Sequence, residues 1–177
     1  SGLLMLPWIV GRGDVGVYGA AYSVWTIYSS ILASVATILF PSVLGKEEAF
    51  FLKYFRKLLP YYVIAFFACV FLALSAKWII RLLFGIQFHG AVPLLVIFTT
   101  TFFLRFLAYP YGILLWTLKK PSILTKFTLL QLIVILPLNY YLIGRYGIVG
   151  AALAHMVVYG FGQCIFSPYF AMRCVIR

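Results

Sequence analysis

Residues 91–117 read AVPLLVIFTTTFFLRFLAYPYGILLWT, and Arg105 is their only charged residue. An α-helix needs about 20 predominantly apolar residues to cross the hydrocarbon core of a bilayer, and this stretch is longer. Apolar residues would cover every side of the helix, which is typical of a helix surrounded by lipid or by other helices. The stretch therefore predicts a transmembrane helix, and other parts of the chain repeat the pattern.

The whole chain shares this apolar character. Of its 177 residues, 65% are hydrophobic and 10% are charged, whereas soluble domains average about 45–50% and about 25%. A protein of 20.0 kDa with a mean hydropathy of +1.09 has too little interior to bury this surface, which therefore needs lipid as its solvent. The net charge of +11 comes from basic residues between apolar runs. We therefore expect membrane lipids, and no nucleic acid, as partners.

Five runs are long enough to cross a bilayer, and they predict an all-α integral membrane protein. Glycine, proline or charged residues separate them. The runs are 17–44, 58–82, 91–117, 122–143 and 147–172. A shorter apolar run at residues 3–10 is interpreted as the tail of a sixth helix. We therefore expect residues 1–177 to form one transmembrane unit, the carboxy-terminal lobe of a longer protein.

Lysine and arginine predict the orientation of these helices, because the loops richer in them face the cytoplasm. One side carries nine of them: Lys46, Lys53, Arg56, Lys57, Lys119, Lys120, Lys126, Arg173 and Arg177. The other side carries four: Arg12, Lys77, Arg81 and Arg145. We therefore expect a multi-pass protein of the inner (plasma) membrane with its carboxy terminus in the cytoplasm.

Residues 46–57, between the first two runs, place aromatic residues at helical spacing with Lys53, Arg56 and Lys57 between them. This pattern predicts a cytoplasmic amphipathic helix that lies on the anionic leaflet. A basic loop that continues into the next span is the alternative.

Arg105 stands near the middle of its predicted span. A charge at the bilayer centre costs about 3 kcal/mol or more, so the side chain should face the bundle interior or a water-filled cavity. Thr101 and Tyr109 lie one turn away on the same face, and Pro110 should kink the helix there. Two roles remain open: Arg105 binds an anionic cargo group such as a phosphate, or it bonds to backbone carbonyls or a partner helix.

Polar side chains also recur along the first, fourth and fifth runs, where they either pack helices together or line a cavity. Gln131 and Asn139 of the fourth run join Thr101, Arg105 and Tyr109 in the predicted substrate-binding set. The other members of these stripes are Tyr22, Thr26, Ser29, Ser30, Ala33, Thr37, Thr128, His155, Tyr159 and Gln163. A lone histidine without an acidic neighbour is a weak proton relay.

Catalysis has few residues to use. The three acids are Asp14, Glu47 and Glu48, and all lie outside the predicted spans. Paired carboxylates, metal-ligand spacings, nucleophile elbows and phosphate-binding glycine loops are not found in the sequence. The chain is therefore expected to be no enzyme, with no catalytic residue, metal or cofactor.

Three segments resemble the carboxy-terminal half of polysaccharide and O-antigen flippases, which belong to the multidrug/oligosaccharidyl-lipid/polysaccharide exporter superfamily. The segments are VGVYGAAY at 15–22, IIRLLFGIQFHGA at 79–91 and NYYLIGRYGIVGAA at 139–152. Each consists of residues common in membranes, but their order and spacing together are more specific. The glycines suit turns between spans and close approach of helices. Gly144 and Arg145 depart from the family, which often has a proline-containing turn there.

The resemblance implies one lobe of a two-lobed fold whose halves enclose a central cavity that opens alternately to either side. It implies that the missing amino-terminal lobe is a partner and that the cargo is a polyprenyl-pyrophosphate-linked oligosaccharide. This cargo moves from the cytoplasmic to the outer leaflet during synthesis of cell-surface polysaccharide, such as the O-antigen of lipopolysaccharide. Three alternatives stay open: a multidrug or toxin extruder of the same superfamily, a lipid-II-type flippase, and a membrane scaffold subunit that transports nothing.

Overall fold

The computed structural model describes residues 6–7, 10–43, 51–117 and 121–175. The elements are α2 (Arg12–Val43), α3 (Phe51–Phe84), the 3₁₀ helix η2 (Ile86–Phe88), α4 (Ala91–Thr117), α5 (Pro121–His155), the π-helix η3 (Met156–Phe161) and α6 (Gly162–Val175). Every secondary-structure element of these residues is helical, which confirms the predicted all-α class. The apolar stretch with Arg105 forms α4.

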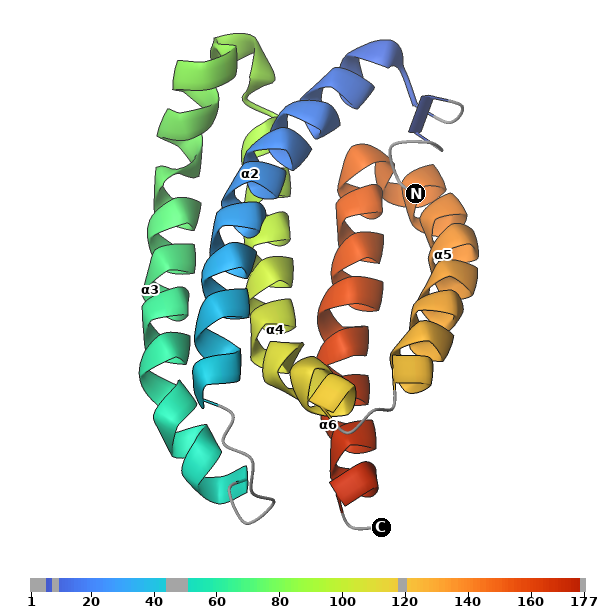
Figure 1. The fold of residues 1–177 in the computed structure, drawn as a ribbon. Helices are drawn as coiled ribbons and strands as arrows, with labels where there is room; N and C mark the ends of the chain where they lie inside the picture. Colours follow the sequence, from blue (N-terminus) through green and yellow to red (C-terminus); the bar gives the residue numbers. More distant parts are fainter. Residues whose placement is uncertain (1–5, 8–9, 44–50, 118–120, 176–177) are drawn as a thin grey trace.

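Helix α4 is the centre of the bundle (Figure 1). It packs against α2 and α3 on one side and against α5, η3 and α6 on the other. The most apolar segment of α4 is 44% buried, whereas that of α3 is 28% buried. The side chains of α4 therefore meet protein on more sides than those of α3, and a polar group on α4 is more enclosed.

The core around α4 is aromatic. Phe98 is fully buried, and its ring lies edge-on to Tyr18 and Tyr22 of α2, with centroids 5.4 and 5.8 Å away. The ring of Trp25 lies 5.6 Å from that of Phe98. Edge-on aromatic pairs contribute about 0.5–1.5 kcal/mol beyond the area that they bury. These contacts hold α2 against the first half of α4.

The outer face of α3 is apolar and exposed. The exposed fraction is 86% for Leu82 and 77% for Leu74, and Trp78 and Phe71 are nearly as open. Such a continuous apolar face is uncommon on soluble proteins. It suits contact with lipid, in agreement with the membrane location that the composition indicates.

Three helices of the described residues are long and apolar enough to cross a membrane: Leu58–Phe84, Ala91–Gly112 and Ser122–Phe170. The predicted count of five full spans and the tail of a sixth is therefore not supported. The fourth and fifth predicted runs fall into one stretch of 49 residues, in which two helical limbs meet at a kink at Gly147 without an intervening loop. Helix α2 is not among the three.

Gly147 is the one position of that long stretch with non-helical backbone angles, φ 58° and ψ −137°. A positive φ is strained for residues other than glycine. Figure 1 shows the chain turning back within the last part of α5, so that the end of α5, η3 and α6 run alongside its first part. The two limbs approach closely: a Cβ atom on Gly150 would collide with the backbone carbonyl of Leu142.

The predicted amphipathic segment at 46–57 lies partly outside the described residues. Residues 46–50 are not described, and Phe51 begins α3. Residues 51–57 therefore belong to the same helix as the span Leu58–Phe84. Their side chains are outside the description, so the amphipathic face stays a prediction.

Candidate functional site

A cavity of about 240 Å³ lies between α2, α4 and α6, and Ser30 and Ala33 on its α2 wall are exposed, so it opens at the surface of the described bundle. Its lining residues are Ser29, Ser30 and Ala33 of α2, Phe102, Arg105, Phe106 and Tyr109 of α4, and Gln163 of α6. Ligand pockets for drug-sized molecules measure about 300–1,000 Å³. The cavity can therefore hold a small polar group, or form the wall of a larger chamber, but it cannot enclose an oligosaccharide.

Arg105 is the only charged residue among those that line the cavity. Tyr22 of α2 and Tyr159 of η3 lie close enough to interact with it electrostatically. Within the described part of the chain, the guanidinium makes no ion pair, because Asp14 is the only acid there and it stands at the start of α2. Arg105 is half-buried, and a guanidinium with five donors and no carboxylate partner is suited to bind an anion.

The phenol of Tyr109 lies one turn beyond Arg105 and ties α4 to α2. Its oxygen lies 2.9 Å from Oγ1 of Thr37, and Thr37 donates its own proton to the carbonyl of Ala33 at 2.8 Å. A hydroxyl has one proton, so Tyr109 is the donor in the first bond. This bond places the aromatic ring of Tyr109 at the edge of the cavity.

His155 belongs to the same polar region, from the opposite helix. Its ring lies 5.3 Å from that of Trp25 and 4.7 Å from that of Tyr159, and its imidazole interacts electrostatically with Arg105. Histidine and arginine both carry donors, so this region is basic rather than acidic. The surrounding rings exclude lipid from it.

The π-helix η3 follows directly after His155. Such π turns are rare and occur frequently at functional sites. The side-chain amide of Gln131 on α5 donates to the carbonyl of Val158 in η3 at 2.9 Å. Gln131 thus supports the wide turn that leads to Gln163 at the cavity.

The structure brings two of the five predicted binding residues together, since Arg105 and Tyr109 line one cavity. Thr101 is buried on α4, and its hydroxyl donates to the carbonyl of Ile97 in its own helix at 2.8 Å. Gln131 is bonded to η3, and Asn139 is buried farther along α5. These three do not line the cavity.

Sequence reasoning left the roles of Ser29, Ser30, Ala33 and Gln163 open between packing and cavity lining, and the structure places all four at the cavity. Phe102 and Phe106 were not singled out. The signal for Phe102 was available, because a residue three before Arg105 shares its helix face, whereas Phe106, the next residue, is not selected by helical spacing. Among the described residues, no group of three or more His, Cys, Asp or Glu could hold a metal ion.

Comparison with known proteins gives one weak relative. An uncharacterized membrane protein in cps region of Klebsiella pneumoniae is 26% identical to this chain over 172 residues. The match covers 95% of the chain and 35% of that protein, so the chain spans about a third of the relative's length. No family model matches the chain. No solved structure matches it.

Proposed function

We propose that the chain is one lobe of a membrane transporter that flips a polyprenyl-pyrophosphate-linked oligosaccharide for cell-surface polysaccharide synthesis. The observation that carries the proposal is a cavity between α2, α4 and α6 with Arg105 as its only charged lining residue. The relative supports a polysaccharide context, since the cps region in its printed name denotes capsule polysaccharide. The three sequence segments that resemble polysaccharide flippases point to the same class.

Arg105 recognises the anionic end of the cargo in this proposal. The barrier to moving a sugar headgroup through a bilayer is the desolvation of its polar groups. A wet cavity lowers that barrier, and a guanidinium binds a phosphate through two parallel hydrogen bonds. Ser30, Tyr109 and Gln163 add neutral hydrogen-bonding groups to the same wall. The translocation makes and breaks no covalent bond, so this lobe acts as no enzyme.

The cavity belongs to a larger chamber in this proposal. About 240 Å³ is too small for the sugar, so a second lobe, contributed by chain beyond these residues, supplies the facing wall. The relative is about three times as long as the match, which leaves room for that lobe. Alternating access then exposes Arg105 to one side of the membrane at a time.

We also propose that the described lobe crosses the membrane five times, and not only through its three most apolar helices. Helix α2 has 32 residues and would be about 48 Å long, which exceeds the about 30 Å of the hydrocarbon core. The 49 residues of Ser122–Phe170 would extend about 74 Å if straight. The turn at Gly147 divides them into two crossings, for five in total. The basic balance then places the carboxy terminus in the cytoplasm and the protein in the inner membrane.

The test is translocation of a polyprenyl-pyrophosphate-linked oligosaccharide by the whole transporter in proteoliposomes. We expect Arg105→Ala to slow translocation about tenfold or more, because a hydrogen-bonded charged group contributes about 1.5–3 kcal/mol. Arg105→Lys should keep part of the rate, since it retains the charge but not the bidentate geometry. Arg145→Ala, which changes an exposed arginine outside the cavity, is the matched control. Undiminished translocation by Arg105→Ala would refute the cargo role.

A further inference from the structure

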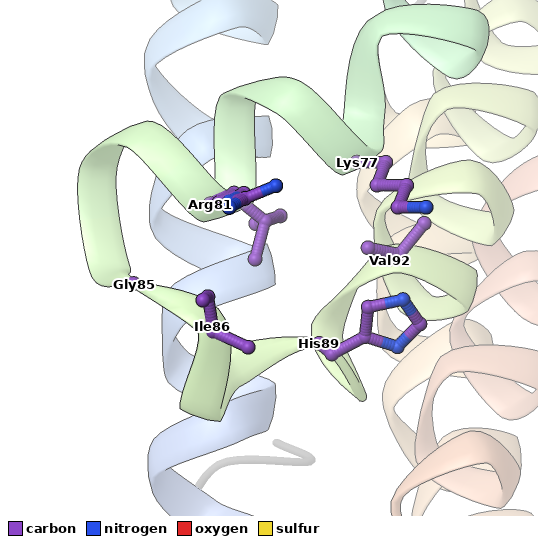
Figure 2. A pocket seen from close by; sticks show the side chains of 7 residues that line it. Lys77, Arg81, Gly85, Ile86, His89 and Val92 are labelled. Atoms are coloured by element: carbon purple, nitrogen blue, oxygen red, sulfur yellow. The ribbon is translucent and has the colours of Figure 1, made fainter.

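A second cavity, of about 140 Å³, lies where α3 ends and α4 begins. Lys77 and Arg81 come from the last turns of α3, and His89 comes from the turn before α4 (Figure 2). Lys77 and Arg81 are four residues apart, so they share one face of α3. Gly85, with φ 89°, ends that helix and lets the chain bring His89 to the same opening.

This cavity is separate from the one that contains Arg105. The two share no lining residue. Val92 belongs to the first turn of α4, whereas Arg105 lies 13 residues farther along the helix, or about 20 Å. The second cavity therefore needs its own explanation.

The rim of the second cavity is basic and its floor is apolar. Lys77, Arg81 and His89 form the rim, and Ile80 and Val92 belong to the floor. No acid is among its lining residues, and Asp14 is the only acid of the described chain. In Figure 2 the side chain of Lys77 extends toward His89 and Val92, and the rim side chains surround one space. An anionic group with an apolar remainder fits this arrangement.

The surroundings indicate that the anion belongs to a lipid. The apolar span Leu58–Phe84 ends at this cavity, which places the rim at the level of the lipid headgroups. Trp78, Leu82 and Ile86 next to the cavity are all more than two-thirds exposed, as expected for side chains in contact with acyl chains. Two cations such as Lys77 and Arg81 near a helix end commonly extend to the headgroups without forming a binding site. The enclosed space and a third basic group from another element distinguish this site.

We propose that this cavity binds the phosphate of an anionic membrane phospholipid, with the apolar floor beneath the glycerol and the first methylene groups. Its volume is smaller than that of pockets for drug-sized ligands, about 300–1,000 Å³, so it takes a headgroup phosphate and not an oligosaccharide. The proposal does not depend on translocation, because the site lies at the membrane surface and shares nothing with the Arg105 cavity.

Native mass spectrometry of the purified full chain tests this site. The protein is titrated with phosphatidylglycerol, with phosphatidylcholine, and with inorganic phosphate alone. The cavity variant combines Lys77→Gln and Arg81→Gln. The matched control combines Lys126→Gln and Arg145→Gln, which remove the same charge from exposed positions outside the cavity.

We expect the wild-type chain to bind phosphatidylglycerol more tightly than phosphatidylcholine and not to bind inorganic phosphate. The cavity variant should bind phosphatidylglycerol about 25-fold more weakly, because each of two cations near an anionic lipid contributes about fivefold. The control variant should bind as the wild type does. Equal affinity of the wild type for the two lipids, unchanged binding by the cavity variant, or displacement of the lipid by inorganic phosphate would each overturn the proposal.

Discussion

Replacing Phe98 by alanine tests whether α4 is the packed centre of a membrane bundle. The ring is fully buried against aromatic side chains of α2. In a soluble protein this change costs about 3–5 kcal/mol, which includes removing the ring from water. In a bilayer the ring of Phe98 stays in hydrocarbon when the helices separate. The substitution therefore costs only the packing contacts of the ring, and no transfer from water. A residual cavity of about 100 Å³ at about 24 cal/mol per Å³ gives a destabilisation of about 2.4 kcal/mol.

Phe71→Ala is the matched control, because the same side chain on α3 is 73% exposed. Its ring already faces outward in the folded bundle and packs little against protein, so we expect a loss of stability below about 0.5 kcal/mol. Equilibrium unfolding in bicelles, followed by steric trapping, measures both free energies. Equal losses at the two positions would refute the assignment of α4 to the core and of the α3 face to lipid. A loss at Phe98 of only a few tenths of a kcal/mol would refute the packing estimate.

Two further predictions concern the close approach of the limbs and the water in the cavity. Gly150→Ala should destabilise the chain by about 1–3 kcal/mol, because the added Cβ meets the rigid carbonyl of Leu142. Gly144→Ala, which has nothing within 4 Å, should be neutral in the same unfolding measurement, and equal losses would contradict the close approach. In a cysteine-free background, Ser30→Cys should react with a water-soluble thiol reagent at least about tenfold faster than Ile31→Cys, which faces outward. Equal rates would mean that the cavity is dry, as in a scaffold.

The helical class could be predicted from sequence because apolar length alone decides it. A run such as 91–117 has no soluble alternative of that length and hydropathy, and it forms α4. The number of crossings could not be predicted in the same way. The glycines near residue 147 were read as a gap between helices, yet only Gly147 leaves the helical region. The break between the two limbs is therefore a kink at one residue and not a loop.

The site was predictable only in part, for a physical reason. Arg105 stands out because a charge in hydrocarbon is costly wherever it points, and Tyr109 follows from helical spacing. The residues of α2 and α6 that line the cavity with Arg105 could not be identified from the sequence. Lipid and protein interior are equally apolar, so the sequence does not show which face of a helix points inward. Gln131 was assigned to the cargo from its polarity, but its amide is bonded to the carbonyl of Val158. Lys77 and Arg81 were used only to predict the orientation, and no cavity was predicted there.

The polar side chains of α4 explain why the proposed function depends on Arg105. Thr99, Thr100 and Thr101 each donate to the carbonyl four residues earlier, so their hydroxyls are satisfied within the helix. A guanidinium cannot be satisfied by one carbonyl, since it carries five donors and a charge. The described part of the chain offers Arg105 no carboxylate, and the groups that interact with it electrostatically are the phenols of Tyr22 and Tyr159 and the imidazole of His155. An anion in the cavity would therefore supply the negative charge that the described residues do not offer Arg105, as the proposed transport of an anionic cargo requires.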